Sequence, residues 1–172
     1  MKLQNKQIAY LLDEGFEDLE FWVPVMRLRE EGARVTILAT KLQPFHGKYC
    51  LEARPDALVT DFSPDDFDGL VVPGGWAPDK LRRSSAVLNL VRGMYAQGKI
   101  VAAICHAGWV LASAGIVRGH RATGSEGIRD DMVNAGAEWV DTPALRDGNL
   151  VWGRVVADIP DFCRELVAAL QK

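Results

Sequence analysis

The sequence lacks most features that assign a chain to a class at sight. Only three of its 172 residues are cysteines, and none form a C-x-x-C spacing, so neither a disulfide framework nor a zinc site is expected. The formal net charge is −3 without a basic cluster, which argues against nucleic acid or a membrane surface as partner. The apolar run at residues 8–12 is too short for a signal peptide or a membrane span.

These absences favour a cytoplasmic protein with free thiols that acts on a small molecule or another protein. The three histidines are scattered along the chain, so no metal and no cofactor are expected. There is also no internal repeat and no low-complexity linker. Residues 1–172 are therefore expected to form a single domain.

Short runs rich in Val, Ile and Leu alternate with longer stretches of helical period, a pattern typical of α/β proteins. Strands are predicted at residues 7–12, 33–39, 67–72, 99–104 and 149–153, with short ones near residues 121 and 139. Residues 49–59 are interpreted as strands or a hairpin outside the main sheet. Helices are predicted over residues 17–32, 84–98, 107–115, 128–135 and the C-terminal segment, with a short one after Ser63. The elements fit one doubly wound sheet with helices on both faces.

Three of these helices carry apolar residues at helical spacing, which predicts the faces that they bury. The predicted buried stripes are Leu19, Trp22, Val23 and Met26 in the first helix; Val87, Leu90, Val91 and Met94 in the second; and Cys163, Leu166, Val167 and Leu170 in the last.

Ligands of such sheets bind beyond the carboxyl ends of the strands, so the segments that follow the strands are candidate sites. Residues 13–20 hold five acids in eight positions, and residues 73–79 form a Pro-Gly-Gly turn that a ligand can approach closely. Residues 120–124 follow a helix and are less clearly placed. The apolar strand KIVAAI is followed directly by Cys105 and His106.

Cys105 lies between a buried strand and a helix start, where unpaired N–H groups favour an anion. A thiol there is expected to ionise below its ordinary pKa of about 8.5 and to act as a nucleophile. The alternative from the residues alone is a buried core cysteine, which is the role predicted for Cys163 on its apolar stripe.

Several separated blocks, in order, resemble the ThiJ/PfpI (DJ-one) superfamily, in particular its PfpI branch of so-called intracellular cysteine peptidases. They are GFEDLE, EEGARVTILA, FDGLVVPGGWAPD, AAICHAGWVLASAGIVRG, IRDDMVNAGAEWVD and DGNLVWGR followed by DIPDFCREL. The resemblance covers nearly the whole chain and implies a flavodoxin-like three-layer sandwich with Cys105 as nucleophile on a strand-to-helix elbow.

The resemblance further implies that His106 is the neighbouring base and that Glu17 lies beside the thiol. Two acids packed together share one proton, so a protonated Glu17 would stabilise the Cys105 thiolate. The other acids of residues 13–20 are interpreted as solvated groups at a helix start. The backbone N–H groups of the Gly74-Gly75 turn and of His106 are the implied oxyanion hole.

Asp79 stands where PfpI-branch relatives carry an acid that reaches the base of a neighbouring subunit. The branch forms dimers that assemble further, so a homodimer or a hexamer is expected. The alternative for Asp79 is a surface acid paired with Lys80 or Arg82.

The sequence also departs from the family pattern. Ala107-Gly108 replaces Gly-Pro after Cys-His, Thr123-Gly124 replaces Thr-Ser, and Trp152-Gly153-Arg154 replaces Thr-Ser-Arg. Large aromatics at Trp76, Trp109 and Trp152 are therefore expected either to reshape the pocket or to pack in the core.

Three functions stay open at this point. The preferred one is a stress-response enzyme of glyoxalase III or protein deglycase type, in which Cys105 attacks a reactive carbonyl or a glycated group. The alternatives are an intracellular cysteine peptidase and a non-catalytic redox sensor that uses the Cys105 thiol.

Overall fold

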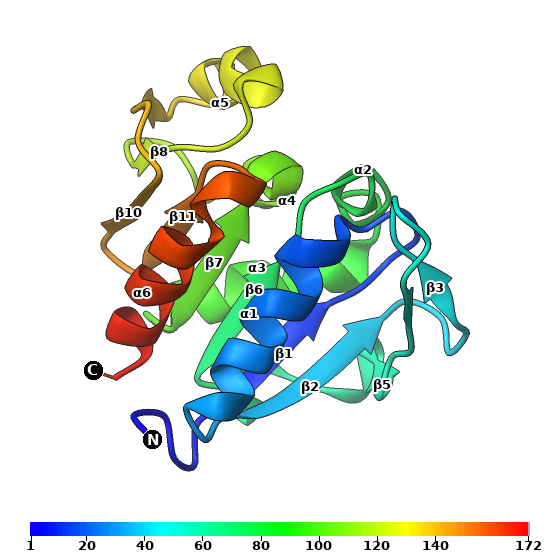
Figure 1. Cartoon of the computed structure of the whole chain (residues 1–172). Helices are drawn as coiled ribbons and strands as arrows, with labels where there is room; N and C mark the ends of the chain where they lie inside the picture. Colours follow the sequence, from blue (N-terminus) through cyan, green and yellow to red (C-terminus); the bar gives the residue numbers. More distant parts are fainter. Residues whose placement is uncertain (172) are drawn as a thin grey trace.

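The computed structural model describes residues 1–171 and is built around a seven-stranded sheet (Figure 1). The strand order is β10-β11-β7-β6-β1-β2-β5, and every neighbouring pair is parallel except the β10–β11 hairpin. The strands are β1 (Gln7–Leu11), β2 (Arg34–Ala39), β5 (Ala57–Leu58), β6 (Gly69–Val72), β7 (Ile100–Ile104), β10 (Ala144–Asp147) and β11 (Leu150–Gly153). The central strands β1, β6 and β7 are almost wholly buried, as expected of a sheet covered on both faces.

Helices cover both faces of this sheet. Helices α1 (Asp18–Glu30) and α6 (Ile159–Leu170) pack against each other on the near face in Figure 1, while α3 (Ser85–Ala96) and α4 (Gly108–Ala114) pack together on the other. Two shorter helices, α2 (Ala77–Leu81) and α5 (Arg129–Asn134), border the edge where the parallel strands end. This arrangement confirms the predicted flavodoxin-like α/β sandwich. Within residues 1–171 no helix is long and apolar enough to cross a membrane.

Two small ribbons lie outside the main sheet. The hairpin of β3 (Phe45–His46) and β4 (Glu52–Ala53) is the excursion expected from residues 49–59, although it starts earlier and β5 returns to the edge of the main sheet. The parallel pair β8 (Arg121–Ala122) and β9 (Glu138–Trp139) confirms the two short strands expected there. Strand β10 was not predicted, because its half-exposed residues ALRD show neither an apolar run nor an alternation.

The apolar stripe predicted for α1 is wrong. The helix buries Phe21, Val25 and Leu28, whereas Leu19, Val23 and Met26 are 47, 39 and 61% exposed. Apolar residues occupy two sides of α1, so periodicity alone could not decide which side meets the sheet.

The stripes predicted for α3 and α6 are confirmed. In both helices the apolar residues lie on one side only, which leaves a single way to pack against the sheet. Cys163 belongs to the buried face of α6, as expected of a core cysteine.

Candidate functional site

A pocket of about 580 Å³ lies beyond the carboxyl ends of the central strands. Its wall comes from the start of α1, the β3–β4 hairpin loop, the turn before α2, the start of α4 and the turn before α6, elements that meet at the upper edge of the sheet in Figure 1. The lining residues are Glu17, Glu20, Lys48, Tyr49, Gly75, Trp76, Cys105, His106, Trp109, Ser125 and Val155 to Ala157. The structure thus gathers the predicted nucleophile, its neighbouring histidine and the glycine turn around one cavity.

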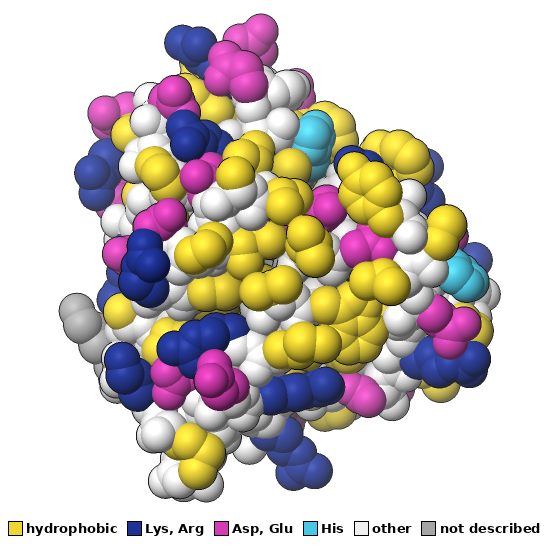
Figure 2. Space-filling view, in the orientation of Figure 1, with side chains coloured by type: hydrophobic (Ala, Val, Ile, Leu, Met, Phe, Trp, Pro, Cys, Tyr) yellow, Lys and Arg dark blue, Asp and Glu magenta, His cyan; other side chains and the backbone are white. Residues whose placement is uncertain are grey.

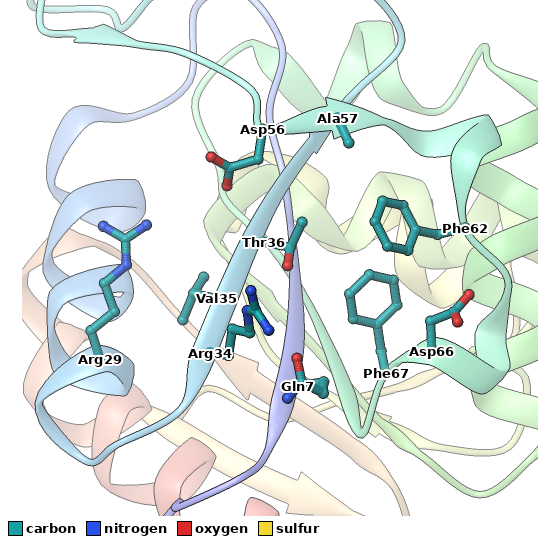
Figure 3. A pocket seen from close by; sticks show the side chains of 10 residues that line it. All are labelled: Gln7, Arg29, Arg34, Val35, Thr36, Asp56, Ala57, Phe62, Asp66 and Phe67. Carbon is teal, nitrogen blue, oxygen red and sulfur yellow. The ribbon is translucent and has the colours of Figure 1, made fainter.

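A second hollow of about 590 Å³ lies along strand β2, next to the short edge strand β5 (Figure 3). Arg29 lies on one side of this strand, while Phe62 and Phe67 lie on the other, so the hollow runs round a sheet edge. Neither a cysteine nor a histidine lines it. The chemistry of this protein is therefore sought at Cys105.

Cys105 stands on a sharp turn between β7 and α4. Its φ of +60° is a left-handed conformation that a residue with a side chain rarely adopts, and such strain is typical of functional positions. The turn is supported because the Ser125 N–H donates to the Cys105 carbonyl at 3.3 Å. A Cβ on Gly124 would approach that carbonyl to 2.7 Å, so glycine fits where the family has serine. The elbow predicted from the sequence is present.

The carboxyl that meets the thiol belongs to Glu20. The Glu20 side chain is fully buried beside Cys105, and its Oε2 accepts from the Gly74 N–H at 3.0 Å. A Cβ on Gly74 would overlap this carboxyl and come within 2.7 Å of the Cys105 Cβ. The glycine at this position is thus required by the close approach of acid and thiol.

The backbone carbonyl of Glu20 accepts a hydrogen bond from outside the helix. Pro24 stands four residues on and has no N–H to donate to the Glu20 carbonyl, so the helix leaves that oxygen unsatisfied. The Tyr10 hydroxyl, fully buried on β1, donates to it at 2.6 Å. Proline and tyrosine together fix the turn of α1 that carries the acid.

The prediction that Glu17 fills this place is wrong. Glu17 is the N-cap of α1, and its Oε2 accepts from the Glu20 N–H at 2.8 Å. Its side chain borders the pocket but is only 4% exposed. The interpretation of Asp18 and Glu20 as solvated acids is also wrong, because both are buried. Spacing alone could not separate three acids on one helical turn.

Burial dominates the protonation of this pair. Loss of solvation, followed by the nearby Glu17 charge, raises the pKa of Glu20 to about 8, so this acid is protonated at neutral pH. Its Oε1 is buried without a hydrogen-bond partner, and an unpartnered buried carboxylate oxygen disfavours the charged form of the acid. A protonated Glu20 can donate to the sulfur, as the sequence reasoning required of an acid at this place.

The pKa of Cys105 is raised to about 12, first by burial and then by the charge of Glu20. The structure therefore contradicts the lowered pKa expected from the helix start. The backbone N–H groups of His106 and Gly75 favour the thiolate and so act to lower this pKa. Because Glu20 is protonated at neutral pH, it does not repel the Cys105 thiolate there. Burial is then the main factor that raises the pKa of Cys105 against the effect of the two N–H donors.

His106 lies within reach of the sulfur, with Nδ1 at 3.2 Å from the Cys105 Sγ. Burial, followed by the charge of Lys48, lowers the pKa of His106, so its ring is neutral at neutral pH and can accept a proton. The ring packs edge-on against Trp109, with the centroids 5.1 Å apart. No carboxylate of residues 1–171 is hydrogen-bonded to it.

Two other predicted site residues have partners that the sequence did not predict. The Gly74 N–H is occupied by Glu20, so only Gly75 and His106 present donors to the sulfur. Asp79, on α2, is exposed and pairs with Arg83 at 2.8 Å, neither of the partners expected from the sequence. Within this chain Asp79 does not contact the His106 ring; its role toward a second subunit stays a prediction.

The departures at Gly108 and Trp152 are packed together. Trp152 is fully buried and does not line the pocket, whereas Trp76 and Trp109 do. A Cβ on Gly108 would lie 2.8 Å from Ile128 and 3.4 Å from the Trp152 ring. Loss of the side chain at position 108 thus accompanies a larger residue on β11, behind the elbow.

Lys48 was missed by the sequence reasoning. It lies in the β3–β4 hairpin loop and is the only lysine or arginine that lines the pocket. No local pattern marks it, because the hairpin is placed over the site by contacts with α1 that are distant in sequence.

Comparison with known proteins identifies the family of the chain. Residues 6–169 match the model of the DJ-1/PfpI family. The chain is 40% identical to deglycase PfpI of Pyrococcus furiosus and 33% identical to putative cysteine protease YraA of Bacillus subtilis. These alignments cover 96 and 97% of this chain and 99% of each relative. The structure of Drosophila melanogaster DJ-1beta superposes with a TM-score of 0.91 at 28% identity, over 96% of this chain and 90% of that one. The chain therefore belongs to the DJ-1/PfpI family.

Proposed function

We propose that this protein is a cysteine-dependent enzyme that acts on small reactive carbonyls or on the glycated groups that they form. The observation that carries the proposal is the environment of the Cys105 sulfur. It contacts a protonated buried acid, a neutral histidine and two backbone N–H donors in one pocket. Relatives of 40% identity named deglycases support the same reading.

The chemistry follows from these groups. Neutral His106 accepts the thiol proton through Nδ1, and protonated Glu20 donates to the resulting thiolate. The sulfur then adds to an aldehyde carbon, forming a C–S bond while the C=O electron pair moves to oxygen. The oxyanion develops beside the N–H groups of Gly75 and His106, and a proton from protonated His106 converts it to the hemithioacetal.

The hemithioacetal of a 2-oxoaldehyde can isomerise. His106 removes the C–H proton to give an enediolate and returns it to the neighbouring carbon; the hydroxyl proton of the sulfur-bearing carbon passes to the neighbouring oxygen, which leaves a thioester of Cys105. Water then hydrolyses the thioester to a 2-hydroxy acid and the free thiol. With a glycated adduct, a C–S bond to Cys105 forms as the bond from the former carbonyl carbon to the amine or thiol breaks, and protonated His106 gives its proton to that leaving group.

The test is a substrate panel of methylglyoxal, glyoxal, methylglyoxal-treated amino acids and fluorogenic peptides, assayed with the wild type and Cys105→Ser. Turnover of the dicarbonyls or adducts that is lost in Cys105→Ser supports the proposal. Peptide cleavage without carbonyl turnover would favour the peptidase instead. Oxidation of Cys105 by mild peroxide, measured by mass, with no turnover of any substrate would favour the redox sensor.

We also propose that the protein is a homodimer formed through the outer face of α1. Leu19, Val23 and Met26 lie at helical spacing and are exposed, and Tyr49 and Leu51 adjoin them because the Asp18 carboxylate accepts from both of their N–H groups. Of the nine exposed large hydrophobic side chains in residues 1–171, five lie in this α1 patch. Figure 2, in the same orientation as Figure 1, shows hydrophobic side chains gathered over this region.

A second copy of the chain fits this surface, because the same apolar stripe on two copies of α1 can pack together about a two-fold axis. Tyr49 belongs both to the α1 patch and to the pocket wall, so the partner would narrow the mouth of the pocket. Light scattering is expected to give a dimer for the wild type and a monomer for Val23→Glu. A monomeric wild type would refute the assembly.

A further inference from the structure

The pocket contains one cationic side chain, Lys48, that is not paired with a carboxylate in the described part of the chain. Lys48 forms no ion pair with any carboxylate in residues 1–171. Its Nζ lies 5.6 Å from the ring centroids of both Tyr49 and Trp76. These two faces hold the ammonium by cation–π attraction while leaving its N–H donors unoccupied by a carboxylate.

The loop that carries Lys48 is fixed to the start of α1. The Lys48 N–H donates to the Phe16 carbonyl at 2.9 Å, and the buried Asp18 carboxylate accepts from Tyr49 and Leu51 at 2.9 Å each. A Cβ on Gly47 would overlap the same carboxylate. The ammonium is thus preorganised at the pocket by backbone contacts on both sides of the lysine.

The acids near the pocket do not supply a partner for this charge. Glu20 is protonated at neutral pH, and Glu17 is almost wholly buried with one oxygen bound to the Glu20 N–H. An anionic substrate would bring the missing partner. A single ammonium suits a carboxylate, since a phosphate site usually combines several donors.

We propose that Lys48 binds a carboxylate on the substrate, so that the pocket selects reactive carbonyls or glycated adducts that carry an acid group beside the group that Cys105 attacks. This inference deepens the proposed function and rests on it for the identity of the reacting group. The anion preference itself can be measured without turnover.

The experiment compares iodoacetate with iodoacetamide as alkylating agents of Cys105. The two reagents share a reacting centre and differ in charge, so the ratio of their rate constants cancels changes in thiolate population. Rates are read by mass spectrometry of the Cys105 peptide in a Cys50→Ser background, because Cys50 is exposed close to Lys48. The ratio for 2-mercaptoethanol serves as the neutral reference.

We expect the ratio at Cys105 to exceed that of 2-mercaptoethanol by about fivefold, the scale of one partly screened charge pair. Lys48→Met should abolish this preference and Lys48→Arg should keep it. Lys41→Met, which removes an exposed lysine outside the pocket, should leave it unchanged. A ratio in Lys48→Met equal to that of the wild type would overturn the inference.

The substrate arm uses the methylglyoxal adducts of N-acetylcysteine and of its neutral amide. The wild type should show a KM about fivefold lower for the acid than for the amide, and Lys48→Met should equalise them. Equal KM values in the wild type would overturn the carboxylate assignment. If neither adduct is turned over but alkylation still depends on Lys48, the proposed function fails while the anion site stands.

Discussion

Replacing Glu20 by glutamine should make the protein more stable and less active. The pKa of Glu20 is raised from 4.5 to about 8 in the folded protein, so folding must hold a proton that the unfolded chain releases. For an acid with a raised pKa, the stability is complete below pH 4.5 and falls as the pH rises toward 8. The full pKa difference between the folded and unfolded states corresponds to about 5 kcal/mol of unfolding free energy, of which about 3 kcal/mol is lost by pH 7.

Glutamine keeps the shape of the side chain and can still accept from the Gly74 N–H, but it does not ionise. The difference in unfolding free energy between Glu20→Gln and the wild type is therefore expected to favour the variant by about 3 kcal/mol more at pH 7 than it does at pH 4.5. Carbonyl turnover should fall by about 100-fold, the usual effect of removing a group that exchanges a proton. The sequence predicts Glu17 as the acid beside the thiol, whereas in the structure it is Glu20.

The assay is urea unfolding of the wild type and Glu20→Gln at pH 4.5, 7 and 8.5, with dicarbonyl turnover measured on the same samples. Glu126→Gln serves as a control, because Glu126 is exposed and pairs only with Arg129 on the surface. A difference in unfolding free energy between wild type and Glu20→Gln that does not change with pH would refute the reasoning. Full turnover in Glu20→Gln would remove this acid from the mechanism.

Three further outcomes are expected. Iodoacetamide should alkylate Cys105 at least about tenfold faster than Cys163, because Cys105 lines the pocket whereas Cys163 is buried on the packed face of α6; peptide mass spectrometry at intervals measures both, and equal rates would contradict an accessible nucleophile. Asp79→Asn should lower turnover about tenfold if the carboxylate orients His106 of the partner subunit, whereas unchanged kinetics in an intact oligomer would leave it a surface acid. Gly74→Ala should displace the buried carboxyl, costing about 1–3 kcal/mol of stability in urea unfolding together with most of the turnover; wild-type values for both would show that the overlap is relieved without consequence.

The sequence by itself determined the order of the central strands and long helices and the place of Cys105. The apolar run of β7, the change of period after it and the glycine that ends α3 are local features, and they put Cys105 at the carboxyl end of a central strand. The buried faces of α3 and α6 were equally predictable, since their apolar residues lie on one side only.

Only the tertiary structure decided which side of α1 meets the sheet and which of its acids meets the thiol. Glu17, Asp18 and Glu20 share one helical turn, and their roles depend on partners that are distant in the sequence: Gly74 and Cys105 for Glu20, and the hairpin backbone for Asp18. The pKa values of the site followed the same rule. A helix start favours a thiolate locally, but burial by surrounding elements costs more, and no single segment records how deeply a group is buried.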